Sequence, residues 1–154
     1  MNYNIRVAIA ADQSQAMALL PELADFAVPD YRNPDHLWQG DAKMLKQFFD
    51  GNTPDSEALV AVDDKATVHG VAIYTMRSEL LSGEPSAHLE VLAVAAESRR
   101  KGIGQALISA TESAASARGA QSLTLHVFAN NTRARALYQA DGFKEELLRC
   151  YKPL

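Results

Sequence analysis

The chain contains a single cysteine, Cys150, and no long hydrophobic run. One cysteine excludes an internal disulfide bond and is typical of a reducing compartment; we expect it to be a packed thiol rather than a nucleophile. No apolar stretch approaches the roughly 20 residues that span a bilayer, and residues 1–10 lack the cationic and apolar regions of a secretion signal. We therefore expect a cytoplasmic protein without a membrane partner.

Positive charge is also scarce. Acidic residues number 19 against 15 basic ones, so the net charge is −4, whereas nucleic-acid binding requires a basic surface. We expect no nucleic-acid partner. The four histidines show no metal-ligand spacing with each other or with Cys150, so we assign no metal. A chain of 154 residues, 47% of them hydrophobic, is expected to form a single domain over residues 1–154.

Hydrophobic periodicity predicts an α/β chain. The expected order is strand, two helices, three strands, helix, strand, helix and a last strand pair. Pro29, Pro34 and Gly40 predict an irregular loop between the first two helices. The expected strands cover residues 5–10, 58–62, 67–76, about 88–94, 122–128 and the chain from 143 onward; the expected helices cover residues 12–27, 42–50, 103–117 and 132–140. Ligands of such mixed sheets bind beside strand ends.

The most informative segment is Arg-Arg-Lys-Gly-Ile-Gly at residues 99–104, between a buried strand and an apolar helix. Three consecutive cations at a helix N-terminus are unfavourable unless an anion neutralises them, and phosphate is the usual anion there. Gly102 and Gly104 would let backbone N–H groups approach that anion without an intervening Cβ. The segment predicts a phosphate-bearing ligand; the alternative is a solvated basic turn.

Two common phosphate-binding motifs are absent. A dinucleotide fingerprint needs a glycine where Leu107 stands, and no Gly-Lys-Ser or Gly-Lys-Thr follows a strand. The segment reads instead Arg-x-x-Gly-x-Gly, and residues 131–143 read Asn-x-x-Ala-x-x-Leu-Tyr-x-x-x-Gly-Phe. These two motifs, in this order over residues 89–143, resemble the coenzyme A-binding region of the GNAT acetyltransferase superfamily.

The resemblance implies a mixed central sheet flanked by helices on both faces, acetyl-CoA as the acyl donor and a primary amine as the acceptor. It implies that two strands splay apart so that backbone groups hold the pantetheine arm, while the 99–105 segment holds the pyrophosphate. An ordinary buried strand would satisfy the same sequence, and Asn131 could also serve as a helix N-cap. The expected coenzyme-binding residues are Leu92, Ala93, Val94, Arg99, Arg100, Lys101, Gly102, Ile103, Gly104, Gln105, Asn131 and Tyr138.

Three residues are catalytic candidates. Tyr138 could protonate the thiolate that leaves when an amine attacks a thioester, the role often given to the matching tyrosine of the family; the alternative is a ring that only packs on the core. Glu90 and His88 share one face of a strand, and either could accept the proton of the amine. Both have structural alternatives, a bond to a neighbouring strand for Glu90 and partial exposure for His88. We favour Glu90.

The acceptor is less well defined. In the family, the two helices after the first strand and their loop often line the acceptor pocket, and here that loop holds Tyr31 and Trp38 among Asp30, Asp35 and Asp41. Aromatic rings and carboxylates could hold a cationic amine, although Trp38 could instead complete the core. A small basic amine is favoured, with a protein N-terminus or lysine left open. A non-catalytic acyl-CoA sensor is the alternative function, and a homodimer is expected by analogy alone.

Overall fold

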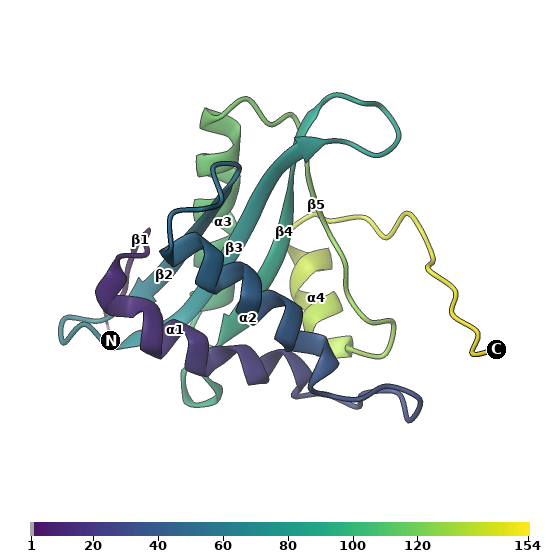
Figure 1. The fold of residues 1–154 in the computed structure, drawn as a ribbon, viewed down its shortest axis with the longest axis horizontal. Coiled ribbons are helices and arrows are strands. Elements are labelled where there is room, and N and C mark those ends of the chain that lie inside the picture. The colour runs from purple at the N-terminus through teal and green to yellow at the C-terminus, as the bar shows by residue number, and fades with distance from the viewer. Residues whose placement is uncertain (1) are drawn as a thin grey trace.

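The computed structural model describes residues 2–154, which form one five-stranded mixed sheet (Figure 1). The strands lie in the order β1-β2-β3-β4-β5. The first four pair antiparallel, and β5 runs parallel to β4. Their bounds are Asn4–Val7 for β1, Ser56–Val62 for β2, Val68–Ser78 for β3, Pro85–Val94 for β4 and Leu123–Leu125 for β5.

Helices cover both faces of this sheet (Figure 1). The helices α1 and α2 pack on one face, and α3 and α4 lie on the other. Their bounds are Gln13–Leu19 for α1, His36–Phe49 for α2, Ile103–Ala117 for α3 and Thr132–Ala140 for α4, with short 3₁₀ segments at Ala10–Asp12, Leu20–Ala24 and Ala96–Ser98. The expected fold class is confirmed.

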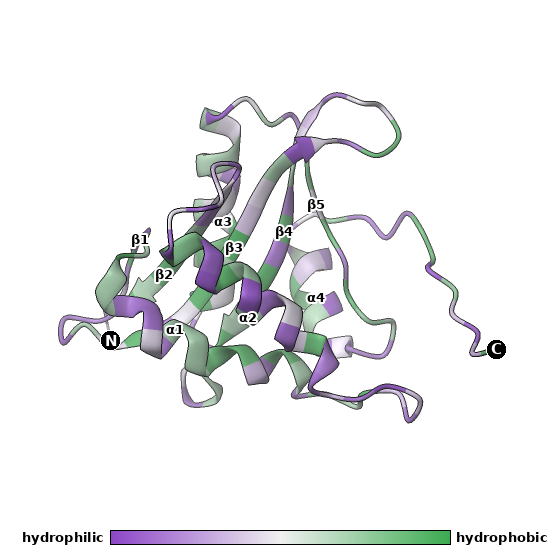
Figure 2. Cartoon of the chain, in the orientation of Figure 1, coloured by the Kyte–Doolittle hydropathy of each residue, from purple (hydrophilic) through white to green (hydrophobic). Residues whose placement is uncertain are grey.

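The core is divided by the sheet into two hydrophobic layers. Leu20 and Leu45 are fully buried in the layer under α1 and α2, and Leu107 and Ile108 are fully buried in the layer under α3. Hydrophobic and hydrophilic residues alternate along α2 in Figure 2, as expected of a helix that buries one face. Within residues 2–154, no helix is long and apolar enough to cross a membrane.

A β-bulge interrupts the pairing of β3 with β4. Ile73 lies opposite Val91 and Tyr74 lies opposite Leu89, so Glu90 is the extra residue. A bulge places two consecutive side chains toward the same side of the sheet and re-aims the extra one. Glu90 therefore points to the face that α1 and α2 cover, beside Val91, which is buried in that layer.

The strands β4 and β5 separate soon after they meet. They pair only from Ala87 with Leu123 to Leu89 with Leu125, while β4 continues to Val94. The backbone of residues 90–94 consequently has no strand partner on the β5 side. The expected splaying of these two strands is confirmed, and residues 126–128 leave the sheet instead of extending the strand as expected.

The helix α2 begins six residues earlier than expected, at His36 instead of residue 42. Pro34 stands just before the helix, where it is well tolerated, and Gly40 lies within it on an open surface. One exposed glycine costs a helix only about 1 kcal/mol, which the apolar face of α2 offsets by packing on the core. The helix α4 has the expected bounds.

The expected strand pair after residue 143 is wrong. The chain from Phe143 to Leu154 has neither helix nor strand and leaves the body of the molecule (yellow in Figure 1). Arg135 of α4 binds both carboxylate oxygens of Glu145, at 2.6 and 2.8 Å, which directs the start of this segment along α4 and away from the sheet. Cys150 is exposed in it rather than packed.

Candidate active site

A cavity of about 160 Å³ lies where β4 and β5 separate. Its walls come from both helical layers and from the sheet between them, and four of the expected site residues, Glu90, Leu92, Asn131 and Tyr138, meet in it. The lining residues are Leu23, Phe26, Leu37, Asp41, Leu89, Glu90, Leu92, His126, Val127, Phe128, Asn131, Ala134 and Tyr138. Several apolar side chains together with a few convergent polar groups are the usual lining of a small-molecule site.

Glu90 enters the cavity from the bulge of β4 and is already paired with a cation. Its carboxylate accepts a hydrogen bond from the guanidinium of Arg77 on β3. The Glu90 side chain is 16% exposed, against 45% for Arg77. The expected base therefore lies in the cavity, with much of its negative charge compensated by Arg77.

Asp41 is a carboxylate of the cavity, and it was expected only as one of three acids in the acceptor loop. It lies four residues after Leu37 and four before Leu45, and so shares the core-facing side of α2 with them. Among residues 2–154 its carboxylate has no hydrogen-bond or ion-pair partner. Burial, together with the negative charge of Glu90, raises the pKa of Asp41 to about 6.

Tyr138 and Asn131 both come from α4. Asn131 caps the helix, since its side-chain oxygen accepts a hydrogen bond from the Ala134 N–H at 3.3 Å. The Tyr138 ring meets Phe143 edge to face at 5.8 Å, and burial raises the pKa of its phenol to about 12. The phenol therefore keeps its proton at neutral pH. Both residues have structural contacts and still line the cavity.

His88 does not reach the cavity. Its side chain lies under β5, where Nδ1 and the Thr124 hydroxyl are 2.7 Å apart and the ring packs against His126. It is only 6% exposed, which corrects the expectation of partial exposure. Burial lowers the pKa of His88 to about 4, so the ring is neutral at neutral pH. It is a weaker candidate for the base than either carboxylate.

The segment before α3 contains two residues in the left-handed conformation. Arg100 and Gly102 have positive φ angles of 61° and 80°, and Gly102 is the N-cap of α3 with no side-chain cap. Left-handed residues in such a turn direct successive N–H groups toward one side. A left-handed arginine is uncommon, and backbone strain of this kind tends to cluster at functional sites.

Most side chains of this loop are already engaged. Arg99 binds Glu22, at 2.5 Å, and Asp25, which ties the loop to the 3₁₀ segment after α1 and to its C-cap. Lys101 donates to the carbonyl of Glu97 at 2.9 Å, and Gln105 donates to Asp141. Arg100 is exposed. The backbone N–H groups and Arg100 are thus the groups best placed for a phosphate.

A buried chain of hydrogen bonds supports the start of this loop. His69 of β3 lies with Nε2 2.9 Å from the Asp63 carboxylate and Nδ1 2.8 Å from the Ser98 hydroxyl. The order resembles a hydrolytic triad, but Ser98 is 1% exposed and no substrate can reach it. Asp63 and His69 therefore hold Ser98, the residue before Arg99, in place.

This support gives a first prediction. Ser98→Ala removes the hydroxyl that His69 binds, and a lost buried hydrogen bond is worth about 1–1.5 kcal/mol. We expect about tenfold weaker binding of coenzyme A, measured by titration calorimetry, with a melting temperature lower by a few degrees. Ser116→Ala, at an exposed serine of α3, should change neither. Unchanged coenzyme affinity in Ser98→Ala would show that the loop does not need this support.

The two aromatic residues expected at the acceptor are not brought to this cavity. Tyr31 is 61% exposed and stacks on Tyr151 at 5.5 Å. Trp38 lies in α2 and packs against the core under α1 and α2. The structure thus favours the alternative in which Trp38 completes the core, because the longer α2 carries it out of the loop.

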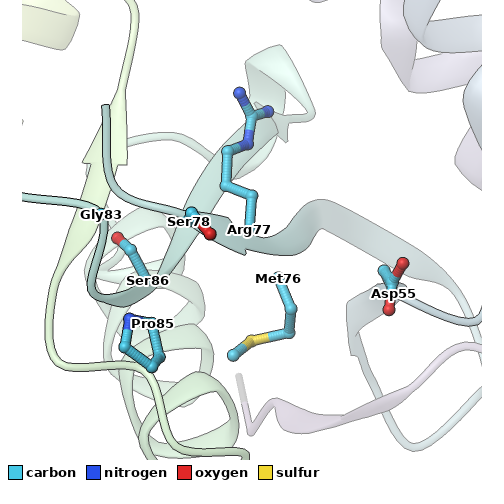
Figure 3. A pocket seen from close by; sticks show the side chains of 7 residues that line it. All are labelled: Asp55, Met76, Arg77, Ser78, Gly83, Pro85 and Ser86. Atoms are coloured by element: carbon cyan, nitrogen blue, oxygen red, sulfur yellow. The ribbon is translucent and has the colours of Figure 1, made fainter. Parts of the chain in front are cut away.

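A second hollow, of about 340 Å³, lies at the far end of the β3–β4 hairpin (Figure 3). It is more open and contains none of the expected site residues. Among the side chains around it, Arg77 is paired with Glu90, and the buried Ser86 hydroxyl is 2.7 Å from that of Ser122. This hollow offers no buried polar group that is free to bind a ligand. Residues 2–154 also contain no group of three side chains suited to a metal ion.

The chain is similar to known proteins over nearly its whole length. The sequence model of the acetyltransferase (GNAT) family matches residues 20–143. The N-acetyltransferase YhfO of Bacillus subtilis (strain 168), itself uncharacterized, is 30% identical over 143 residues, which cover 93% of this chain and 91% of YhfO.

Solved structures with the same fold include a Pyrococcus furiosus protein assigned as an acetyl transferase. It has a TM-score of 0.79 at 20% identity and covers 99% of this chain and 100% of its own. The structure of AAC(6')-Iy in complex with the bisubstrate analog CoA-S-monomethyl-acetylneamine has a TM-score of 0.74 at 22% identity, over 100% of this chain and 99% of its own. At these identities the likeness concerns the fold.

Proposed function

Since this chain belongs to the GNAT family and is an acetyl-CoA-dependent N-acetyltransferase, we propose that it transfers acetyl to a primary amine by direct attack in a ternary complex. The observation that carries the proposal is the cavity at the free edge of β4. It brings the Tyr138 phenol together with the Asp41 and Glu90 carboxylates. An acid that keeps its proton and a carboxylate that accepts one are the two groups aminolysis of a thioester needs.

The described residues fit the coenzyme. The left-handed Arg100 and Gly102 present N–H groups to a pyrophosphate, and the free backbone of Leu92, Ala93 and Val94 can pair with the amides of a pantetheine arm. When bound, acetyl-CoA supplies a thioester that an amine can attack. The neighbour AAC(6')-Iy binds a coenzyme A bisubstrate analog on the same fold, which supports a coenzyme site here.

The side chains have separate roles in this proposal. Tyr138 donates its O–H to the leaving sulfur, and the amide of Asn131 holds the arm beside it. With acetyl-CoA bound, a free backbone N–H of β4 would donate to the thioester oxygen and stabilise the negative charge that develops there. The carboxylates of the cavity attract the ammonium form of the acceptor.

We favour a small basic amine as the acceptor. A cavity of about 160 Å³ admits a slender chain, and its two carboxylates suit a cation better than a neutral or acidic group. A protein N-terminus or lysine that reaches in from outside is the second candidate. The expected homodimer and cytoplasmic location remain proposals that rest on the sequence.

The experiment that tests the proposal is a melting curve with acetyl-CoA, with ATP and NAD as controls. A ligand at about 100 times its Kd adds roughly 2.7 kcal/mol to the free energy of unfolding, which raises Tm by several degrees in a domain of this size. We expect the shift with acetyl-CoA alone, followed by release of free thiol when a suitable amine is added. A folded protein that shows no shift at saturating acetyl-CoA would contradict the proposal.

A further inference from the structure

The cavity contains two carboxylates in different surroundings. Glu90 is bound by Arg77, whereas Asp41 has no cationic partner among the described residues. A carboxylate held by a guanidinium gains little from taking up a proton, since protonation breaks a charge-assisted hydrogen bond. An unpaired carboxylate in a partly buried site is stabilised more by taking up a proton, because protonation removes a buried charge. Of the two, Asp41 is therefore the better proton acceptor.

The position of Asp41 is unusual for a helix that packs on a core. Leu37 and Leu45, one turn before and one turn after Asp41, are apolar, and Leu45 is fully buried. An acid between them breaks the pattern that stabilises α2, at a cost in folding free energy. Departures of this kind are expected where a residue serves function.

We propose that Asp41, rather than Glu90, accepts the proton from the attacking amine, an inference that rests on the proposed acetyl transfer. The ammonium form of the acceptor enters between the two carboxylates and gives one proton to Asp41. The neutral amine nitrogen then forms a bond to the acetyl carbon, and the carbon–sulfur bond breaks with its electron pair on sulfur. The second proton of the nitrogen passes to that sulfur through the Tyr138 hydroxyl, and Asp41 returns its proton to water.

The charged and titratable groups around Asp41 are consistent with this role. From β4 it meets Glu90, whose charge raises the pKa of Asp41, and from β3 Arg77 acts through its pair with Glu90. His126, which follows β5, lines the same cavity. The neutral phenol of Tyr138 lines it from α4. His88 is buried and neutral behind them. The 3₁₀ segment after α1 and the residues that follow it contribute only apolar side chains to the cavity, Leu23 and Phe26.

The first test needs no acceptor. In protein labelled with ¹³C-aspartate, the Asp41 carboxyl resonance, identified by its loss in Asp41→Asn, is followed from pH 3 to 9. We expect a midpoint near 6 that falls in Glu90→Gln, where the neighbouring charge is gone. A midpoint near 4 in the folded wild type would overturn the inference. If acetyl-CoA still raises Tm, the proposed function survives that result; if acetyl-CoA does not bind, the proposed function fails whatever Asp41 does.

The second test measures thiol release against pH with 1,4-diaminobutane, butylamine and a peptide with a free N-terminus as probes. We expect Asp41→Asn to lower kcat at least 30-fold at pH 7 and to remove the acidic limb of the profile, whereas Glu90→Gln keeps that limb at lower pH. Asp50→Asn, at the exposed C-cap of the same helix, is the matched control and should match wild type. A raised KM with unchanged kcat in Asp41→Asn, or loss of the limb in Glu90→Gln alone, would overturn the inference.

Stability separates this role from a structural one. The pKa of Asp41 is raised to about 6 in the folded state. The protein is therefore expected to lose stability as pH rises from the pKa of the unfolded carboxyl to about 6, because the folded state must then hold an unpaired charge. Asp41→Asn removes that unpaired charge, so its Tm at pH 8 should exceed that of the wild type. A variant that is more stable and less active cannot owe its lost activity to misfolding, whereas a lower Tm at pH 8 would show that Asp41 holds the fold together.

Discussion

Replacing Tyr138 with phenylalanine is expected to lower kcat by about 100-fold while the Kd of acetyl-CoA changes by less than about threefold. General acid catalysis by a positioned side chain contributes about 10²–10⁴-fold in rate. The Tyr138 ring lines the cavity and packs on Phe143, and phenylalanine keeps that packing. Only the hydroxyl is removed, so the loss should fall on the chemical step. Single-turnover thiol release and titration calorimetry measure the two quantities separately.

The raised pKa of Tyr138 explains why the effect is not expected to be larger. Burial raises the pKa of this phenol to about 12, well above the value of about 8.5 for a simple thiol. Complete transfer of the phenolic proton to sulfur would be uphill, so the hydroxyl acts by donating its proton as another proton replaces it. Tyr151→Phe, at an exposed tyrosine of the C-terminal segment, is the matched control. Wild-type kcat in Tyr138→Phe would leave the phenol with a packing role alone.

Most of the fold could be predicted from the sequence because it depends on local patterns. The helix α4 has the bounds that its periodicity predicts, and the loop before α3 contains the glycine that its left-handed turn requires. The splaying of β4 and β5 was implied by the family resemblance. The C-terminal strand pair was wrong because pairing depends on a partner strand, which no local pattern supplies; β5 pairs over three residues only.

The candidate site was harder to predict, because two long-range features define it. Glu90 is directed into the cavity by a bulge that depends on the register between β3 and β4. Asp41 faces it only because α2 starts at His36, so that residues 37, 41 and 45 share one side of the helix. A loop was expected over residues 29–40, so Asp41 was grouped with the acids of that loop. The signal that distinguishes it, a single acid at an apolar position of a helix, depends on the correct start of α2.

The same error of helix bounds misplaced the acceptor site. Trp38 drew attention as the one tryptophan of the chain, in a loop expected to line the pocket. As a residue of α2 it packs on the core instead. Composition identifies which residues carry chemistry, but the side of a helix on which they lie depends on where the helix begins. Of the residues expected in the acceptor loop, the cavity therefore contains the carboxylate of Asp41 but neither aromatic ring.

The second large effect is expected at the start of α3, where Gly104→Asp should raise the Kd of coenzyme A at least 100-fold. Gly104 is the second residue of the helix, after Ile103, so an aspartate there places a negative charge among the N–H groups that would hold the pyrophosphate. The same charge interacts favourably with the helix N-terminus, by about 0.3–1 kcal/mol. The variant should consequently lose the coenzyme without losing the fold, which calorimetry and a melting curve would show.

The matched control for this variant is Gly104→Ala, because the added Cβ has its own effect. A Cβ at Gly104 would lie 3.2 Å from the Leu137 Cδ2 atom, a tight contact that the flexible end of that leucine can relieve by a small shift. Alanine also favours the helix over glycine by about 1 kcal/mol. We expect Gly104→Ala to keep coenzyme affinity within about tenfold of the wild type. If alanine and aspartate weakened binding equally, crowding against α4 rather than charge would be the cause, and the loop would not be the phosphate site.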